Sequence, residues 1–144
     1  NFDRPLNQCS LRDAPEMGQR LKKRGVKPEI ILCSPAQRAR QTAELLTKEF
    51  GGIMDGVHFD DRIYEADLGT LLDLIRSLPD TCASAMLIGH NPSIGFLAHQ
   101  LSDVHIEQMP TCAIATLELL ASHWKNMGKE ATRLLDFDHP KKIL

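Results

Sequence analysis

Two arginines stand where a helix is expected to begin. In "IILCSPAQRARQTAELL", residues 30–46, a β-branched apolar run ends at Ser34, and a helical pattern follows with Arg38 and Arg40 in its first turns. A helix N-terminus already carries partial positive charge, so cations are unfavourable there unless an anion binds, and phosphate is the commonest such anion. A guanidinium can hold two phosphate oxygens at once and keeps its charge. The pattern indicates a phosphate site, although an arginine on a solvated helix face has the same local sequence.

The two arginines cannot both serve one site. Arg38 and Arg40 are separated by about 200° around a helix, so they face different directions. We expect Arg38 to face the anion and Arg40 to be solvated or structural.

A second group of polar residues follows another apolar run. His90 and Asn91 come directly after "SAMLIG", residues 84–89, and Gly89 allows the backbone to approach a ligand closely. A histidine that caps a turn is the ordinary alternative. The position nevertheless favours His90 as a group that contacts the same anion.

A carboxylate completes the set. Glu65 lies in "RIYEADLG", residues 62–69, where polar residues predict a loop. A carboxyl group there could exchange a proton with a reacting group. Asp67 is a nearby rival, and a solvated carboxylate is the ordinary alternative for either residue.

The elements that must position these residues alternate along the chain. Apolar patterns predict helices over 11–24, 36–50, 70–78 and 90–101, buried strands over 29–33 and 84–89, a partly exposed extended segment over 57–66, and late strands over 113–120 and 131–137. Strands alternating with helices indicate an α/β sheet with crossovers, in which ligands bind beyond the carboxyl ends of the strands. Both polar junctions lie at such ends. Residues 1–144 show no linker or repeat, so one domain is expected.

Composition excludes several other classes of protein. The chain has 144 residues, 42% of them hydrophobic and 25% charged, with a formal net charge of −2. This charge offers no basic excess for nucleic acid, and no apolar run approaches the ~20 residues of a membrane span. No signal peptide is visible, and the four cysteines lack metal-ligand or redox spacing. We therefore expect a reduced, cytoplasmic protein that binds neither nucleic acid nor membrane. The sequence does not indicate the oligomeric state.

Three motifs together resemble a known family. "SPAQRARQTAELL", "YEADLG" and "MLIGHNPSIGFLA" resemble, in order and spacing, the histidine phosphatase superfamily, and most closely its SixA-type phosphohistidine phosphatases. The N-terminal "FDRPLNQCSLRDA" resembles the "RPL" loop and the helix that follows it in members of this branch. The resemblance implies a three-layer α/β sandwich like that of phosphoglycerate mutase, with a mostly parallel central sheet and helices on both faces.

The resemblance also implies roles for individual residues. Arg38 corresponds to the phosphate-binding arginine and His90 to the second active-site histidine. Glu65 matches the position of an acidic proton donor. Ser34 and Asn91, which belong to the same motifs, are expected to help bind phosphate.

One part of the family pattern is missing. The family's nucleophile is a histidine in an Arg-His-Gly or Arg-His-Ala motif, on a strand that precedes the "RPL" loop. The sequence from Asn1 onward contains no such motif. We expect the sequence to be a fragment of the domain whose nucleophilic histidine lies upstream of Asn1, on a strand of about 5–6 residues.

The implied reaction is two-step phosphoryl transfer without metal or cofactor. The upstream histidine attacks phosphorus, Arg38 and His90 neutralise the phosphoryl oxygens, Glu65 protonates the leaving group, and water cleaves the phosphoenzyme. The expected substrate is a phosphorylated protein, with phosphohistidine foremost, or a small phosphate ester.

Two alternative functions remain open, and a third is excluded. A non-catalytic phosphate-binding protein on the same fold is one, and a sugar-phosphate phosphatase or phosphomutase of the same superfamily is another. A thiol phosphatase is excluded by spacing. Four residues separate Cys33 from Arg38 and six separate it from Arg40, and neither count suits a phosphate loop of that kind.

Overall fold

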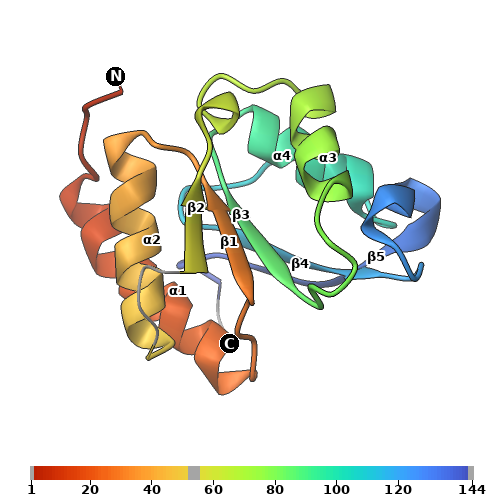
Figure 1. The fold of residues 1–144 in the computed structure, drawn as a ribbon. Coiled ribbons are helices and arrows are strands. Elements are labelled where there is room, and N and C mark those ends of the chain that lie inside the picture. The colour runs from red at the N-terminus through yellow and green to blue at the C-terminus, as the bar shows by residue number, and fades with distance from the viewer. Residues whose placement is uncertain (1, 52–55, 143–144) are drawn as a thin grey trace.

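The computed structural model describes residues 2–51 and 56–142, which alternate between strands and helices (Figure 1). The helices are α1 (Gln8–Lys23), α2 (Gln37–Glu49), α3 (Leu68–Arg76) and α4 (Ser93–Leu101), and the strands are β1 (Ile30–Cys33), β2 (Val57–Phe59), β3 (Ala85–Ile88), β4 (Ile114–Leu119) and β5 (Thr132–Asp138). Short 3₁₀ turns cover Asp61–Ile63, Trp124–Asn126 and Lys129–Ala131. Each helix and strand expected from the sequence is present, and the extended segment shortens to β2 and a 3₁₀ turn. Of the two glycines that follow the helix expected over 36–50, Gly52 lies outside the described residues.

Three parallel strands form a sheet in the order β2-β1-β3. The register pairs Cys33, at the end of β1, with both Phe59 of β2 and Ile88 of β3. The three carboxyl ends therefore stop at one level. Two backbone hydrogen bonds continue the ladder there, since the Ser34 N–H donates to the carbonyl of Ile88 at 3.0 Å and the Asp60 N–H to that of Cys33 at 3.0 Å.

Helices cover both faces of this sheet, as alternation along β1 requires. Ile31 and Cys33 pack on one face with Ala39 and Ala43 of α2, whereas Leu32 packs on the other face against a cluster from α3 and α4. Figure 1 shows α1 and α2 on one side of the sheet and α3 and α4 on the other. The expected α/β class with a parallel sheet between helical layers is confirmed.

One expectation about burial was wrong. Residues 84–89 were expected to form a buried strand, but every residue of β3 is partly exposed. The reason is topological: β3 lies at an edge of the three-stranded sheet, and only β1 pairs with it among the described residues. An apolar run indicates that the side chains of a strand can be buried, but it does not indicate how many other strands pair with that strand.

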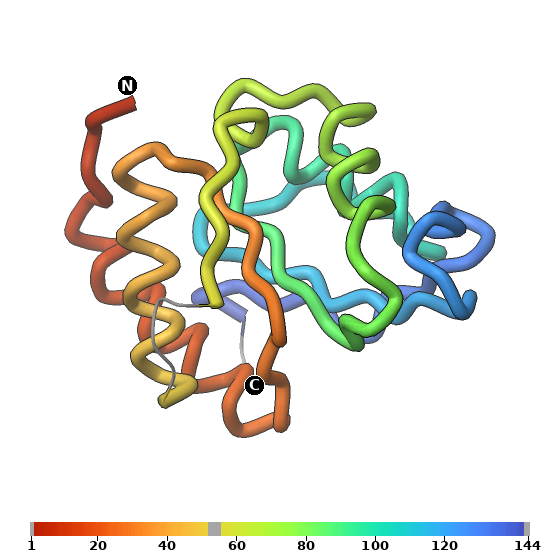
Figure 2. Tube along the Cα trace, in the orientation of Figure 1, coloured from red at the N-terminus to blue at the C-terminus, as the bar shows by residue number. Residues whose placement is uncertain are grey.

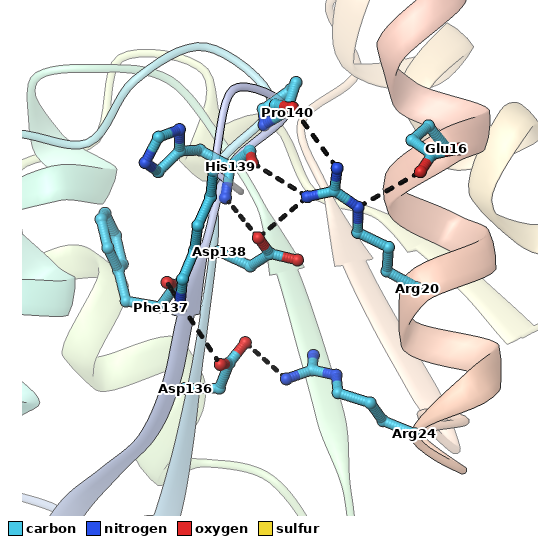
Figure 3. Close-up of polar contacts among 9 residues, drawn as sticks. Glu16, Arg20, Arg24, Asp136, Phe137, Asp138, His139 and Pro140 are labelled. Carbon is cyan, nitrogen blue, oxygen red and sulfur yellow. Dashed lines mark hydrogen bonds and ion pairs between the residues drawn. The ribbon is translucent and has the colours of Figure 1, made fainter. Parts of the chain in front are cut away.

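A second, antiparallel sheet of β4 and β5 is attached to α1 by buried charge (Figure 3). The Arg20 guanidinium of α1 lies 3.0 Å from an oxygen of Asp138 and donates to the backbone carbonyls of His139 and Pro140. The side chains of Arg20 and Asp138 are only 13% and 7% exposed. A second ion pair joins Arg24 to Asp136 one turn along the helix. These contacts fix the C-terminal sheet against the layer formed by α1 and α2.

Candidate active site

The segments that follow β1 and β3 gather with the loop after β2 at one end of the parallel sheet (Figure 2). They line a half-open cavity of about 310 Å³. Its wall contains Arg38, Glu65, His90 and Asn91, four of the five residues expected to form a site, together with Tyr64 and Ser93. Parallel strands that end at one level explain how residues so far apart in sequence meet.

Arg38 and Arg40 diverge as their separation on the helix predicts. Arg38 is half-buried in the cavity wall. Arg40 is exposed, its guanidinium carbon lies 4.3 Å from the ring centroid of Phe59, and neither residue lines the cavity. Arg38 is therefore the arginine that can contact an anion in the cavity.

His90 is held in place from several directions. Its Nε2 lies 2.7 Å from Ser34 Oγ, the Tyr64 ring meets its ring edge-on with centroids 5.7 Å apart, and its carbonyl accepts a hydrogen bond from Ile94. Burial and then the positive charge of Arg38 hold the pKa of His90 below its ordinary value. The imidazole is therefore neutral at pH 7 and can donate one proton to an anion.

Ser34 occupies a different place from the one expected. We expected it to help bind phosphate, but its side chain is fully buried and is absent from the residues that line the cavity. Its Oγ contacts His90 and accepts the backbone N–H of Ala36 at 3.2 Å. The turn from β1 into α2 thus places this hydroxyl against the histidine ring and not in the cavity wall.

The geometry separates Glu65 from its rival. Glu65 is an exposed residue at the cavity wall. Asp67 instead caps α3, because its Oδ1 accepts the Thr70 N–H at 2.8 Å, and this backbone hydrogen bond lowers the pKa of Asp67. Asp67 is thus engaged in holding a helix end. Glu65 is the carboxylate that can reach a group in the cavity.

Two contacts around the rim were not anticipated from the sequence. The Ser93 hydroxyl donates to the carbonyl of Ala66 at 2.5 Å, which ties the start of α4 to the loop that carries Glu65. The Asn91 side chain donates to the carbonyl of Met109 at 2.9 Å. Both contacts join segments distant in sequence. Only Ser93, which directly follows Gly89-His90-Asn91-Pro92, offered a sequence signal.

The remaining nucleophile and metal candidates are unsuited to the site. Cys33 is fully buried, its sulfur lies 3.3 Å from the carbonyl oxygen of Ser34 and 3.4 Å from that of Ala39, and burial raises its pKa to about 12. It cannot supply a thiolate at neutral pH. Within residues 2–51 and 56–142, no group of three or more His, Cys, Asp or Glu residues is placed to hold a metal ion. In the same ranges, no helix is long and apolar enough to cross a membrane.

The fold and cavity thus define an α/β protein with a polar, arginine-containing site at the carboxyl end of a parallel sheet. A family model described as the histidine phosphatase superfamily (branch 1) matches residues 1–78. Uncharacterized proteins of Mycobacterium tuberculosis and Mycobacterium leprae are each 30% identical over 98% of this chain, which covers 92% and 89% of their lengths. The chain belongs to the histidine phosphatase superfamily.

Solved structures agree and indicate the SixA type within that superfamily. A structure assigned to the phosphohistidine phosphatase SixA of Agrobacterium tumefaciens is 29% identical, with a TM-score of 0.78 over 96% of this chain and 85% of that one. A protein histidine phosphatase SixA complexed with tungstate is 24% identical and has a TM-score of 0.80 over 97% of this chain and 86% of that one, and it shares the fold.

Proposed function

We propose that the protein is a phosphatase that hydrolyses phosphohistidine in a phosphoprotein, or a related phosphate monoester, through a phosphohistidine enzyme intermediate. The observation that carries the proposal is the meeting of Arg38, His90 and Glu65 in one cavity. A permanent cation, a neutral imidazole and a carboxyl group are the parts that phosphoryl transfer without a metal requires. The name of the Agrobacterium protein, phosphohistidine phosphatase, agrees with this assignment.

Each residue has a distinct part in the proposed reaction. Arg38 holds two oxygens of the phosphoryl group and offsets the charge that develops on them. His90 donates a hydrogen bond to a third oxygen. Glu65 protonates the leaving group in the first step and then takes a proton from the water that attacks the phosphoenzyme.

The nucleophile is proposed to lie upstream of Asn1. Among the described residues His90 is the histidine in the cavity wall, and the others lie elsewhere: His58 on β2, His99 packed on His105, His123 on Asp80, and His139 beside Phe137. None of these lines the cavity, whereas in-line attack on a phosphorus atom held by Arg38 requires the nucleophile within about 3–3.5 Å.

The sheet offers a place for the strand that would carry this nucleophile. The apolar residues of β3 and β4 are all partly exposed, and in the described part of the chain β3 pairs only with β1 and β4 only with β5. One further strand added parallel to β3 would satisfy its open backbone groups and bury its side chains. The carboxyl end of that strand would stop beside Gly89 and His90, so the residue that follows would enter the cavity. We propose a single domain completed in this way.

The form of the cavity supports a substrate presented by another macromolecule. Glu65, Asn91 and Pro92 at the rim are exposed, so a phosphoryl group on the surface of a protein can reach Arg38.

The four cysteines form no disulfide among the described residues. This is compatible with the reducing cytoplasm, where we propose that the reaction takes place.

The test compares the protein translated from its natural start codon with the 144 residues beginning at Asn1. Both are assayed on a phosphohistidine-containing protein and on phenyl phosphate. We expect turnover only from the longer protein, with acid-labile, base-stable phosphate on a histidine upstream of Asn1 when the reaction is quenched. Equal turnover by both proteins would place the nucleophile within the 144 residues. Phosphate binding without turnover by the longer protein would favour a non-catalytic binding role.

A further inference from the structure

A buried hydroxyl lies directly behind the histidine of the cavity. Ser34 is 0% exposed, and its Oγ lies 2.7 Å from Nε2 of His90. The position of Ser34 is fixed by the sheet, because its backbone N–H donates to the carbonyl of Ile88, two residues before His90. The hydroxyl and the ring are thus held together by the pairing of β1 with β3.

The donors and acceptors around Ser34 indicate which group donates the hydrogen in this contact. A serine hydroxyl has one proton to donate and two lone pairs that accept. The Ala36 N–H already uses one lone pair of Oγ at 3.2 Å. If Nε2 carried a proton and donated it to Oγ, the hydroxyl proton would have no acceptor among the described residues and, being buried, no water. A buried polar hydrogen without a partner is costly, whereas donation from the hydroxyl to an unprotonated Nε2 gives both the hydroxyl proton and Nε2 a partner.

We propose that Ser34 is a positioning residue that holds His90 in the neutral tautomer with its proton on Nδ1. The role of this tautomer rests on the proposed function, in which the Nδ1–H is the hydrogen that His90 donates to a phosphoryl oxygen. Without Ser34 the ring would exchange between tautomers, and a fraction of the molecules would present a lone pair to an anion instead of a proton. The lowered pKa of His90, caused by burial and by Arg38, agrees with a ring that stays neutral.

The tautomer is measured directly by ¹⁵N NMR of the imidazole nitrogens, on the full chain labelled at histidine. The His90→Gln variant assigns the His90 signals by their disappearance. We expect a pyrrole-like Nδ1 and a pyridine-like Nε2 for His90 at pH 7.5. A pyrrole-like Nε2, or an equal mixture of the two forms, overturns the proposal. This readout requires no turnover, so it stands or fails independently of the proposed activity.

The second test removes the hydroxyl. Loss of a hydrogen bond of about 1 kcal/mol changes the tautomer ratio by about fivefold, so in Ser34→Ala we expect the signals to shift toward a mixture and kcat to fall by no more than that factor, with KM nearly unchanged. The hydroxyl donates to the neutral ring, so its removal also raises the pKa of His90, and the acid limb of the kcat profile moves to higher pH.

Two further variants separate positioning from simple packing. Ser102→Ala removes another buried hydroxyl, one that accepts from Val104 at the end of α4, far from the cavity. It should lower stability without altering the His90 signals or the acid limb. Ser34→Thr retains the hydroxyl and should retain the Nδ1–H tautomer. If Ser34→Ala leaves the tautomer of wild type, or if Ser34→Thr loses it while remaining folded, Ser34 does not set the proton on His90.

Discussion

Replacing Arg38 by alanine removes the permanent charge from the cavity wall. Arg38 is half-buried there, beside His90 and Glu65. Loss of one such preorganised donor to a developing oxyanion costs about 10²–10³-fold in kcat, which is about 2.7–4 kcal/mol of transition-state stabilisation. We expect this loss for phenyl phosphate and for a phosphohistidine protein alike, because both present the same phosphoryl oxygens.

Arg40→Ala is the matched control. Its guanidinium lies over the Phe59 ring and outside the cavity, where an exposed cation–π contact contributes about 0.5–1 kcal/mol to folding. We expect a slightly lower urea midpoint and an unchanged kcat. Equal losses of kcat in the two variants would refute the assignment of the two arginines to different faces of α2.

The pH profile adds a second check on Arg38. Its charge lowers the pKa of His90, so Arg38→Ala should raise that pKa, and the acid limb of kcat should move to higher pH. Arg38→Lys keeps a positive charge but loses the two-pronged grip on phosphate. It should retain the wild-type acid limb while losing most of the rate. An acid limb that does not move in Arg38→Ala would show that Arg38 does not act on His90.

Three further outcomes follow from individual contacts. Glu65→Gln should slow hydrolysis of a phosphate with a poor leaving group by about 10²–10⁴-fold and of an activated aryl phosphate much less, whereas equal slowing would exclude Glu65 as the proton donor. Arg20→Ala leaves Asp138 buried without its partner and should lower the free energy of unfolding by about 3–5 kcal/mol in urea titrations, against about 1 kcal/mol or less for the more exposed Arg24→Ala, and similar losses would contradict the importance of burial. The lowered pKa of His90 means that the unfolded chain binds its proton more readily, so the stability from neutral His90 is complete above about pH 6.5 and declines as the pH falls through the folded pKa. Unfolding midpoints at pH 7.5 and 5.5 should therefore differ more in wild type than in His90→Gln. An identical difference in the two proteins would show that His90 does not contribute to the pH dependence of stability.

The sequence alone determined the fold class and the places where chemistry gathers. Apolar runs that end in polar strand-to-helix junctions predicted the positions of Arg38 and His90, because parallel strands bring their carboxyl ends to one edge of a sheet. The 3.6-residue helical period separated Arg38 from Arg40. These are local regularities, since they depend on residues within a few positions of each other.

Contacts between distant segments were decided only by the tertiary structure. The burial of Ser34 against His90 depends on the register of β1 with β3. Arg20 and Asp138 are 118 residues apart, and no periodicity links them. Sequence patterns report the local preferences of a chain. Whether a polar side chain is shielded from solvent or exposed to it depends on what packs against it after the chain has folded.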